Sequence, residues 1–309
     1  MITRRHLLAG SAVAIASAAL AATTEPSIID AHFHIWDRGQ LEIPWLHTAG
    51  ELLNRDYTPA HYQHAIAGLN VRGSVYVEVA VDPPQRVKEA GIASKLCNLK
   101  QPRVLAAVVG GDPTDPGFAR YVDLLQARAA IHGMRVTLPS KPATNAAVLK
   151  GLRRLGKLHL TVDLNAGGSQ LLEMVELLKA CDETLFVIDH CGNASPSWFE
   201  RAAERSNIDL WQKTIEKLAA CPNVACKISG VAENGPAAKP ESIHAVARFC
   251  LDAFGPDRVL FATNWPVCLK ATTPAKWFST VDQLTRQSPV TDRDKLFAQN
   301  AERWYRLAQ

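Results

Sequence analysis

From residue 28 to its end, the chain alternates eight apolar runs of strand length with stretches of helical periodicity. Most of the runs are rich in Val, Ile and Leu, as strands covered on both faces are. The predicted strands are 28–35, 73–79, 104–109, 133–138, 158–164, 184–189, 224–228 and 259–262. Amphipathic helices are predicted between them, at 83–99, 143–156, 170–180, 210–220 and 241–254, and a long helical region, 274–307, closes the chain.

This order predicts an α/β fold, the (β/α)8 TIM barrel, because eight units of strand followed by helix fit into about 280 residues. A doubly wound open sheet is the alternative. That fold favours a glycine-rich turn after the first strand, whereas here the first strand runs into His32-Phe33-His34. The sequence has neither an internal repeat nor a low-complexity linker, so residues 28–309 are predicted to form one domain.

The first 21 residues have the pattern of an export signal. Arg4 and Arg5 precede a weakly apolar stretch, 7–20, which ends in the small residues Ala19-Leu20-Ala21, a typical cleavage pattern. The stretch is too short to span a bilayer. The paired arginines resemble a twin-arginine signal, with an ordinary secretory signal as the alternative. We expect the twin-arginine machinery to export the chain to the periplasm, where residues 1–21 are removed and nothing stays inserted in the membrane.

Charge and composition exclude several classes of protein. The 309 residues include 34 basic and 30 acidic side chains, a net charge of +4. Loss of Arg4 and Arg5 leaves 32 against 30, or +2. No long basic run is present, so a nucleic-acid partner is not expected. The hydrophobic share of 47% is that of a globular chain rather than a disordered one or a coiled coil.

Polar side chains gather where the predicted strands end, which is where barrel enzymes carry out their chemistry. His32 and His34 end the first strand and His190 ends the sixth. Side chains alternate along a strand, so His32 and His34 face the same side. Two or three imidazoles at one barrel mouth can bind a divalent ion. Alone, the pair could equally be two polar residues at a strand end, but His190 strengthens the prediction of a site.

Motifs in a defined order resemble the amidohydrolase-related family, in the branch of sugar lactonases and 2-pyrone-4,6-dicarboxylate lactonase. The resemblance covers essentially the whole chain after the signal and rests on 29–37, 44–46, 75–78, 133–135, 187–192, 223–230, 260–267 and 300–305. It implies an amidohydrolase-like TIM barrel that hydrolyses a lactone, the cyclic ester of a sugar acid or related ring acid. Such an enzyme is a carboxylic ester hydrolase whose partner is a small-molecule substrate.

One position departs from the resemblance. The superfamily usually has Asp at the end of strand eight, where it binds metal and accepts a proton from water, and this sequence has Asn264. An amide does not ionise and is not a general base. We therefore expect one divalent ion, Zn²⁺ or Mn²⁺, on His32, His34 and His190, or a metal-free site; the residues leave both open. With His32, His34 and Asn264, His190 completes the predicted catalytic set and is the favoured proton acceptor.

Five further residues are predicted to bind substrate: Glu78, Arg135, Asp163, Lys227 and Trp36. Arg135 suits a carboxylate or sugar hydroxyls, but a salt bridge to another strand is its structural alternative. Lys227 could equally be structural, and Trp36 could offer its ring face to a sugar or simply pack. Glu78 and Asp163 are also alternatives to His190 as proton acceptor.

Two other functions remain open from the sequence. One is a metal-dependent decarboxylase of a ring carboxylic acid, which usually needs a complete ligand set of three His and one Asp. The other is a periplasmic binding protein on a barrel that has lost its activity. Asn264 weakens the first alternative and favours the second, whereas the retention of His32, His34 and His190 speaks against the second.

Overall fold

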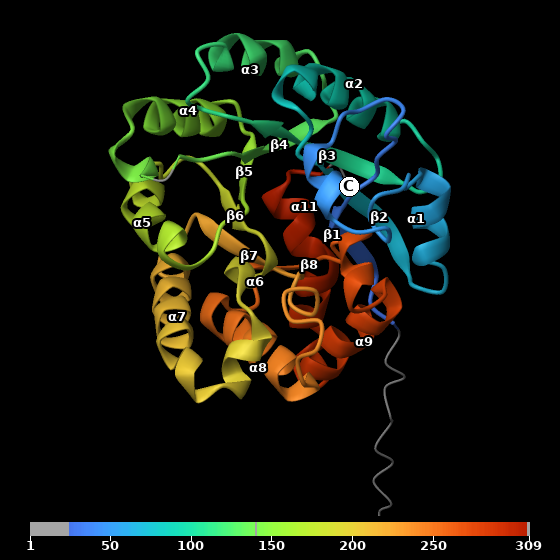
Figure 1. The fold of residues 1–309 in the computed structure, drawn as a ribbon, viewed down its shortest axis with the longest axis vertical. Helices are drawn as coiled ribbons and strands as arrows, with labels where there is room; N and C mark the ends of the chain where they lie inside the picture. Colours follow the sequence, from blue (N-terminus) through green and yellow to red (C-terminus); the bar gives the residue numbers. More distant parts are fainter. Residues whose placement is uncertain (1–24, 140, 308–309) are drawn as a thin grey trace, which may run out of the picture.

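The structure is a computed structural model and describes residues 25–139 and 141–307. Eight parallel strands lie side by side in sequence order at the centre of the molecule (Figure 1). They are β1 Ile28–Phe33, β2 Val71–Val77, β3 Val104–Gly111, β4 Ile131–Val136, β5 Thr161–Leu164, β6 Phe186–Ile188, β7 Val224–Ile228 and β8 Val259–Phe261. The eight strands confirm the prediction of a (β/α)8 barrel, and β7 matches its predicted bounds.

The barrel closes between its first and last strands, just beyond the end of β8. The backbone N–H of His34 donates to the carbonyl of Trp265 at 2.7 Å, and that of Asn264 donates to the carbonyl of His32 at 2.9 Å. The side chain of Asp30 also joins β1 to the residues after β8, because its carboxylate accepts from both the N–H and the hydroxyl of Thr263. The closure therefore places Asn264 directly beside the histidine pair.

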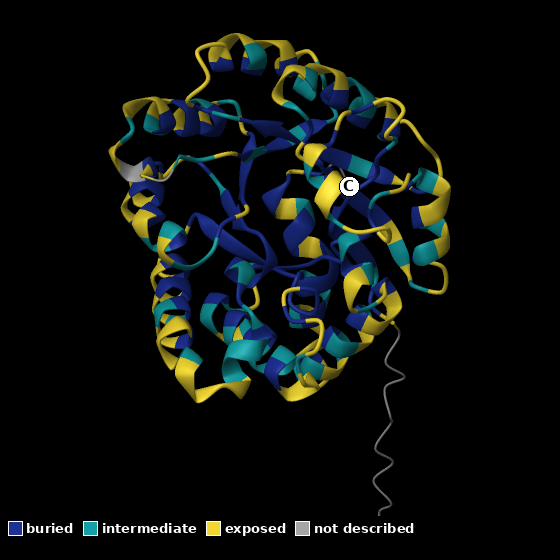
Figure 2. Ribbon diagram, viewed as in Figure 1, coloured by how far each residue is buried: buried dark blue, intermediate teal, exposed yellow. Residues whose placement is uncertain are grey.

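Helices surround the barrel and cover its outer face (Figures 1 and 2). They are α1 Pro59–Ala65, α2 Arg86–Leu96, α3 Phe118–Gln126, α4 Ala146–Lys157, α5 Gly168–Lys179, α6 His190–Asn193, α7 Arg205–Ala219, α8 Pro240–Phe254, α9 Pro274–Thr285, α10 Val290–Asp294 and α11 Asn300–Trp304. The strands are almost wholly buried, while the outer faces of the helices are exposed (Figure 2).

The closing helical region differs from the prediction of one continuous stretch. It is divided into α9, α10, a π-helical turn at Lys295–Gln299 and α11. Pro289 explains the first break, because it lacks the N–H that would continue α9 and instead precedes the first residue of α10.

The segment 300–307 closes the N-terminal end of the barrel. Tyr305, which is fully buried, packs with Ile29, Ala31 and the other inward-facing apolar residues of the strands. The hydroxyl of Thr161, the first residue of β5, donates to the carbonyl of Trp304 at 2.5 Å. Because the N-terminal end of the barrel is closed, its open mouth is at the C-terminal ends of the strands, where the predicted site residues lie.

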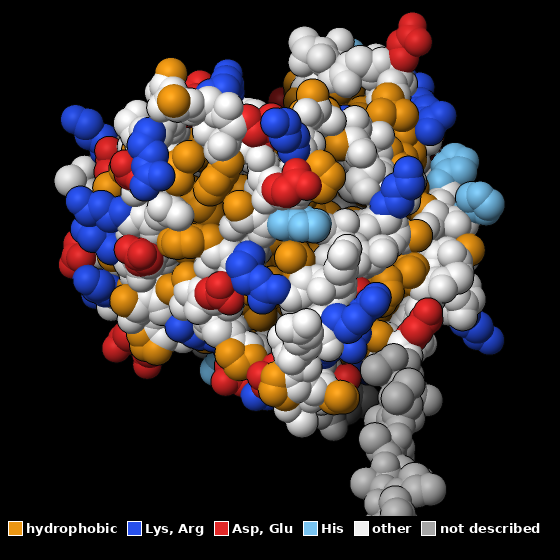
Figure 3. Space-filling view, turned by 90° about the horizontal axis from the view of Figure 1, so that it is seen from below, with side chains coloured by type: hydrophobic (Ala, Val, Ile, Leu, Met, Phe, Trp, Pro, Cys, Tyr) orange, Lys and Arg blue, Asp and Glu red, His pale blue; other side chains and the backbone are white. Residues whose placement is uncertain are grey.

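Predictions for the N-terminus fall outside the described residues, since residues 1–21, including the twin-arginine pair, are not among them. Among the residues that the structure describes, no helix is long and apolar enough to cross a membrane. Basic and acidic side chains are interspersed over the face seen in Figure 3.

Candidate active site

The structure brings the three predicted histidines together at the barrel mouth. Nε2 of His32 lies 3.0 Å from Nε2 of His34. The ring centre of His190 lies 4.6 Å from that of His32. All three are buried, with exposed fractions of 0%, 5% and 7% for His32, His34 and His190. His32 on β1, His34 just after it and His190 at the start of α6 therefore form one compact group.

The backbone around His190 is built to hold its ring. His190, Cys191, Gly192 and Asn193 all adopt positive φ, a conformation that costs free energy for residues other than glycine and is common at functional sites. Nδ1 of His190 lies 2.9 Å from the hydroxyl oxygen of Ser229. Gly230, with φ +70°, packs against the same side chain, and a Cβ there would lie 2.3 Å from Cβ of His190. The loop after β7 thus requires glycine at this position.

A hydrogen bond fixes the tautomer of His34, and two charged groups approach Nδ1 of His32. Nδ1 of His34 lies 2.8 Å from the carbonyl oxygen of Val77. A carbonyl only accepts, so this Nδ1 carries the proton and Nε2 keeps a lone pair. Nδ1 of His32 lies 3.0 Å from Nζ of Lys227. The same Nδ1 lies 3.3 Å from Oδ1 of Asp189. The proton shared between the two Nε2 atoms would have to leave before both rings could bind one metal ion, because a ligating imidazole nitrogen carries no proton.

Lys227 is fully buried beneath the histidines, and its ammonium group has three polar neighbours there. Its Nζ donates to Asp163 at 2.5 Å and to Asp189 at 2.9 Å, in addition to His32. Asp163 also accepts from the hydroxyl of Tyr305 at 2.8 Å. The prediction that Lys227 and Asp163 bind substrate is therefore corrected: with 0% exposure and filled hydrogen bonds, they position His32.

Burial sets the charge states of the site. It lowers the pKa of His34 to about 3 and that of His190 to about 4, and it holds the pKa of His32 well below its usual value. The imidazoles are therefore neutral at physiological pH. Burial opposes ionisation of Asp189 as well, but the charge of Lys227 outweighs it and holds the pKa of this carboxyl well below its usual range. Asp189 is thus a permanent anion beside three neutral rings.

Glu78 and Arg135 form an ion pair at the rim of the mouth. Nε of Arg135 donates to Oε1 of Glu78 at 2.5 Å, and its Nη2 donates to the carbonyl oxygen of Glu78 at 3.0 Å. The pair spans β3, where Gly110 leaves room for the carboxylate. About a tenth of each side chain is exposed, 11% for Arg135 and 10% for Glu78. The salt bridge that was the structural alternative for Arg135 is thus present, while Nη1 makes no hydrogen bond among the described residues and lies 4.0 Å from Oδ2 of Asp189.

Trp36 packs rather than offering a face to a ligand. It is 1% exposed, its indole N–H donates to the carbonyl of Arg55 at 2.6 Å, and its ring meets Trp45 and Tyr57 edge-on. The prediction of a substrate contact is corrected by this burial.

Asn264 lies next to an acidic residue for which no role was predicted. Its Nδ2 donates to Oε1 of Glu233 at 2.7 Å, and the two residues are 4% and 6% exposed. Burial raises the pKa of Glu233 to about 7. Glu233 stands in the loop between β7 and α8, where the sequence offers only a loose resemblance to a family position, because the loop has no strand or helix periodicity. The sequence analysis also assigned no role to Asp189, although it selected the next residue, His190.

The donor set at the mouth fits a metal ion. Ligand atoms of His32, Asp189 and His190 all lie within 4.8 Å of one another. His34 presents the lone pair of its Nε2 to the same space. Oδ2 of Asp189 is buried without a hydrogen-bond partner among the described residues. Neutral imidazoles with an adjacent carboxylate are the ligands that divalent transition metals prefer.

The family model described as amidohydrolase matches residues 29–307, nearly the whole of the described chain. The chain belongs to the amidohydrolase family. This amidohydrolase is 26% identical to an L-fucono-1,5-lactonase of Burkholderia multivorans, with 91% of this chain and 96% of the relative covered. Its structure resembles a B. multivorans amidohydrolase solved with bound zinc, with TM-score 0.79, 25% identity and coverage of 91% and 99%. A probable 2-pyrone-4,6-dicarboxylic acid hydrolase of Acinetobacter baumannii shares the fold, with TM-score 0.71, 17% identity and coverage of 91% and 100%.

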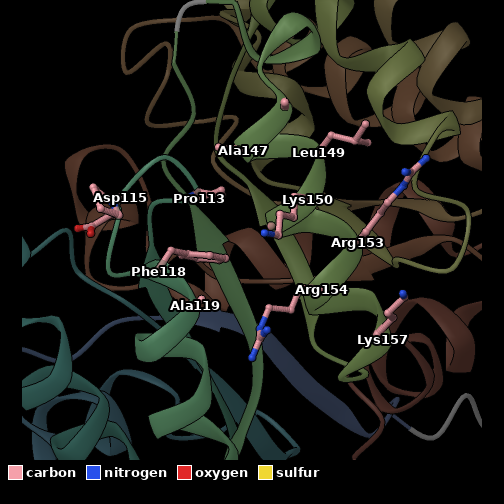
Figure 4. A pocket seen from close by; sticks show the side chains of 13 residues that line it. Pro113, Asp115, Phe118, Ala119, Ala147, Leu149, Lys150, Arg153, Arg154 and Lys157 are labelled. Carbon is pink, nitrogen blue, oxygen red and sulfur yellow. The ribbon is translucent and has the colours of Figure 1, made fainter.

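A separate hollow lies on the outer surface of the amidohydrolase, between α3 and α4 (Figure 4). Pro113 and Phe118 line one side of it, and the α4 side chains Lys150, Arg153 and Lys157 line the other. It contains none of the residues of the histidine group. The candidate active site is therefore the barrel mouth.

Proposed function

We propose that this amidohydrolase hydrolyses a lactone, the cyclic ester of a sugar acid or related ring acid. The observation that carries the proposal is the group of three neutral imidazoles at the barrel mouth, with the anion of Asp189 beside them. The sequence likeness to an L-fucono-1,5-lactonase over 91% of the chain supports the same reaction class. A decarboxylase is disfavoured, because its usual ligand set ends with an Asp at the position of Asn264.

The reaction needs a nucleophile, a stabilised oxyanion and a protonated leaving group. Water adds to the lactone carbonyl carbon, and the resulting tetrahedral oxyanion collapses with cleavage of the ring C–O bond. The ring oxygen takes a proton and leaves as the hydroxyl of the open-chain acid. His190 is placed to take part, because Nδ1 is held by Ser229 and the neutral ring can accept or pass a proton. The N–H of a neutral imidazole can donate to the developing oxyanion.

The exposed edge of Arg135 is proposed to bind the substrate. A guanidinium binds carboxylates and vicinal hydroxyls through several parallel hydrogen bonds. Glu78 fixes the orientation of Arg135 and shares the rim with it. A sugar acid bound by Arg135 would have its polar part beside the histidines.

A single Zn²⁺ or Mn²⁺ is the proposed cofactor, held by His32, His34 and His190 with Asp189 adjacent. When bound, it would act as a Lewis acid that polarises the lactone carbonyl. A metal-free route would use the same imidazoles and Arg135 as hydrogen-bond donors. Activity measured with and without chelator, alongside the metal content of the protein, separates the two.

Export to the periplasm is also proposed, on the residues of the N-terminal segment alone. The support is the order of Arg4 and Arg5, a short apolar stretch and small residues up to position 21. Replacement of both arginines by lysine is expected to leave the precursor in the cytoplasm, which cell fractionation measures. Export of the lysine variant at the normal rate would contradict the twin-arginine proposal.

The reaction class is tested by acid release from a panel of sugar and pyrone lactones. The lactonase proposal expects release far above the spontaneous rate on at least one of them. Release of CO2 from ring carboxylic acids would instead support the decarboxylase, and binding without turnover would support a binding protein.

A further inference from the structure

Lactone hydrolysis leaves a proton to be accepted from the attacking water, and Asn264 stands where the family resemblance leads one to expect an acid. The carboxamide of Asn264 does not take up this proton. Asp189 does not suit the task either, because its Oδ1 accepts from Lys227, whose charge holds the pKa of this carboxyl low. Asp163 is fully buried with its oxygens on Lys227 and Tyr305. Glu78 is held in its ion pair with Arg135, and His190 is assigned the transfer of the proton to the leaving group. The acceptor is therefore sought in the loops around the mouth.

Glu233 is the carboxylate that contacts Asn264. Its Oε1 accepts from Nδ2 of Asn264 at 2.7 Å, and no other residue of the described chain makes a hydrogen bond with this carboxylate. Asn264 is fixed at the mouth, because its backbone N–H donates to the carbonyl of His32 at 2.9 Å. Three residues before Glu233, Gly230 packs directly against His190. Glu233 is thus hydrogen-bonded to the residue beside His32, and it belongs to the same loop as the glycine that packs against His190.

No positively charged partner offsets the free-energy cost of burying the carboxylate of Glu233. The residue is 6% exposed, yet no salt bridge of the described chain includes it, and its hydrogen-bond donor is a neutral amide. An unpaired buried carboxylate costs stability, and such costs are typically retained at functional sites. A residue that only packed or bridged two loops would do so at lower cost as Gln.

We propose that Glu233 is the proton acceptor of the hydrolytic reaction and that Asn264 positions it, the pair taking over the task of a single Asp at the end of β8. This inference rests on the proposed lactonase function. A water that donates to Oε2 of Glu233 loses that proton as its oxygen bonds to the lactone carbonyl carbon. The ring C–O bond then breaks, and the proton returns from Glu233, directly or through His190, to the ring oxygen. Atoms and charge balance without any co-reactant.

The electrostatic surroundings of Glu233 suit this role. Burial raises its pKa to about 7, while its own backbone N–H, the hydrogen bond from Asn264 and the charge of Lys270 act in the opposite direction. The other titratable groups that face it are the thiols of Cys191 and Cys268. A carboxylate whose pKa lies near neutrality is ionised in a large fraction of molecules and is still basic enough to take a proton from water.

The test compares Glu233→Gln with the exchanged pair Glu233→Gln/Asn264→Asp, on whichever lactone the wild-type protein hydrolyses. Glu233→Gln keeps the shape and the hydrogen bond to Asn264 but not the basicity. We expect kcat to fall about 100-fold or more with KM changed only a few-fold, and the acid limb of the wild-type pH profile near pH 7 to disappear. The exchanged pair restores one carboxylate and one amide, and is expected to regain at least about tenfold of the lost kcat together with an acid limb.

Each outcome bears on the proposal. The exposed Glu241→Gln, at the start of α8, is the matched control and should leave kcat and the pH profile unchanged. Glu233→Gln with kcat within threefold of wild type would overturn the role of Glu233 and leave the lactonase proposal intact. A folded exchanged pair no more active than Glu233→Gln would also overturn it. Failure of the wild-type protein to hydrolyse any lactone would overturn both.

Discussion

Nζ of Lys227 lies 3.0 Å from Nδ1 of His32 and donates, within the same cluster, to Asp163 and Asp189. Oδ1 of Asp189 lies 3.3 Å from the same nitrogen of His32, so Lys227 and Asp189 together hold the ring of His32 in place beside His34. Tyr305, from the segment that plugs the bottom of the barrel, donates to Asp163 and extends the network downwards. Tyr305 is thus connected through the buried groups Asp163 and Lys227 to His32 at the mouth.

Removal of the buried cation should be severe. Lys227→Met leaves Asp163 and Asp189 facing each other without a positive charge between them. We expect the free energy of unfolding to fall by about 3–5 kcal/mol at neutral pH, the usual cost of breaking a buried ion pair, as measured by urea denaturation. Lys213→Met, on the exposed side of α7, is the control and should change stability little. A Lys227→Met protein as stable as wild type would show that the network does not hold the fold.

Gly230 should be needed for the placement of His190. An alanine Cβ there would lie 2.3 Å from Cβ of His190, so the imidazole must move. We expect Gly230→Ala to lower kcat on a lactone substrate by about 10²-fold, the order of loss that follows a small displacement of a reacting group. Gly50→Ala is a matched control, because Gly50 also has positive φ but nothing lies within 4 Å of the added Cβ. Similar losses in both variants would mean that backbone strain, not the histidine, is responsible.

The ligand set predicts how zinc should bind. Metal-stripped protein is expected to take up about one equivalent of Zn²⁺, measured by calorimetry and metal analysis, because the imidazoles and Asp189 form a single group. His34→Asn should weaken this binding strongly, since it removes the lone pair that Val77 orients. His159→Asn is the control, because His159 is exposed and its positive φ is tolerated by Asn. Equal zinc affinity in the two variants would place the metal elsewhere.

Glu89 predicts a pH-dependent stability. It is fully buried on α2 and accepts from the N–H of Val79 at 2.7 Å, and burial together with Glu78 raises its pKa from 4.5 to about 8. A raised carboxyl pKa favours the protonated form in the fold, so its stabilising contribution is present below pH 4.5 and is lost as the pH rises towards 8. Glu89→Gln should therefore gain stability over wild type across this range, by about 1–3 kcal/mol at pH 9. The exposed Glu216→Gln should show no such trend, and a constant difference for Glu89→Gln would disprove the assignment.

The sequence predicted what depends on periodicity and missed what depends on contacts between loops. The apolar runs were enough to predict eight strands, and the alternation along β1 was enough to place His32 and His34 together. Nothing local distinguishes a lysine that reaches substrate from one enclosed by two carboxylates, so Lys227 and Asp163 were given the wrong contacts. Glu233 meets Asn264 across 31 residues, through a loop without periodicity, and only the folded chain shows that pair.

The most direct measurement is acid release from a panel of sugar and pyrone lactones by the protein without residues 1–21, compared with His190→Ala. The account predicts hydrolysis of at least one lactone far above the spontaneous rate, and a fall in kcat of about 100-fold or more in the variant. Chelation with measured metal content then assigns the histidines to a metal or to a metal-free site. No acid release from any lactone, or the same kcat in His190→Ala, would contradict the account.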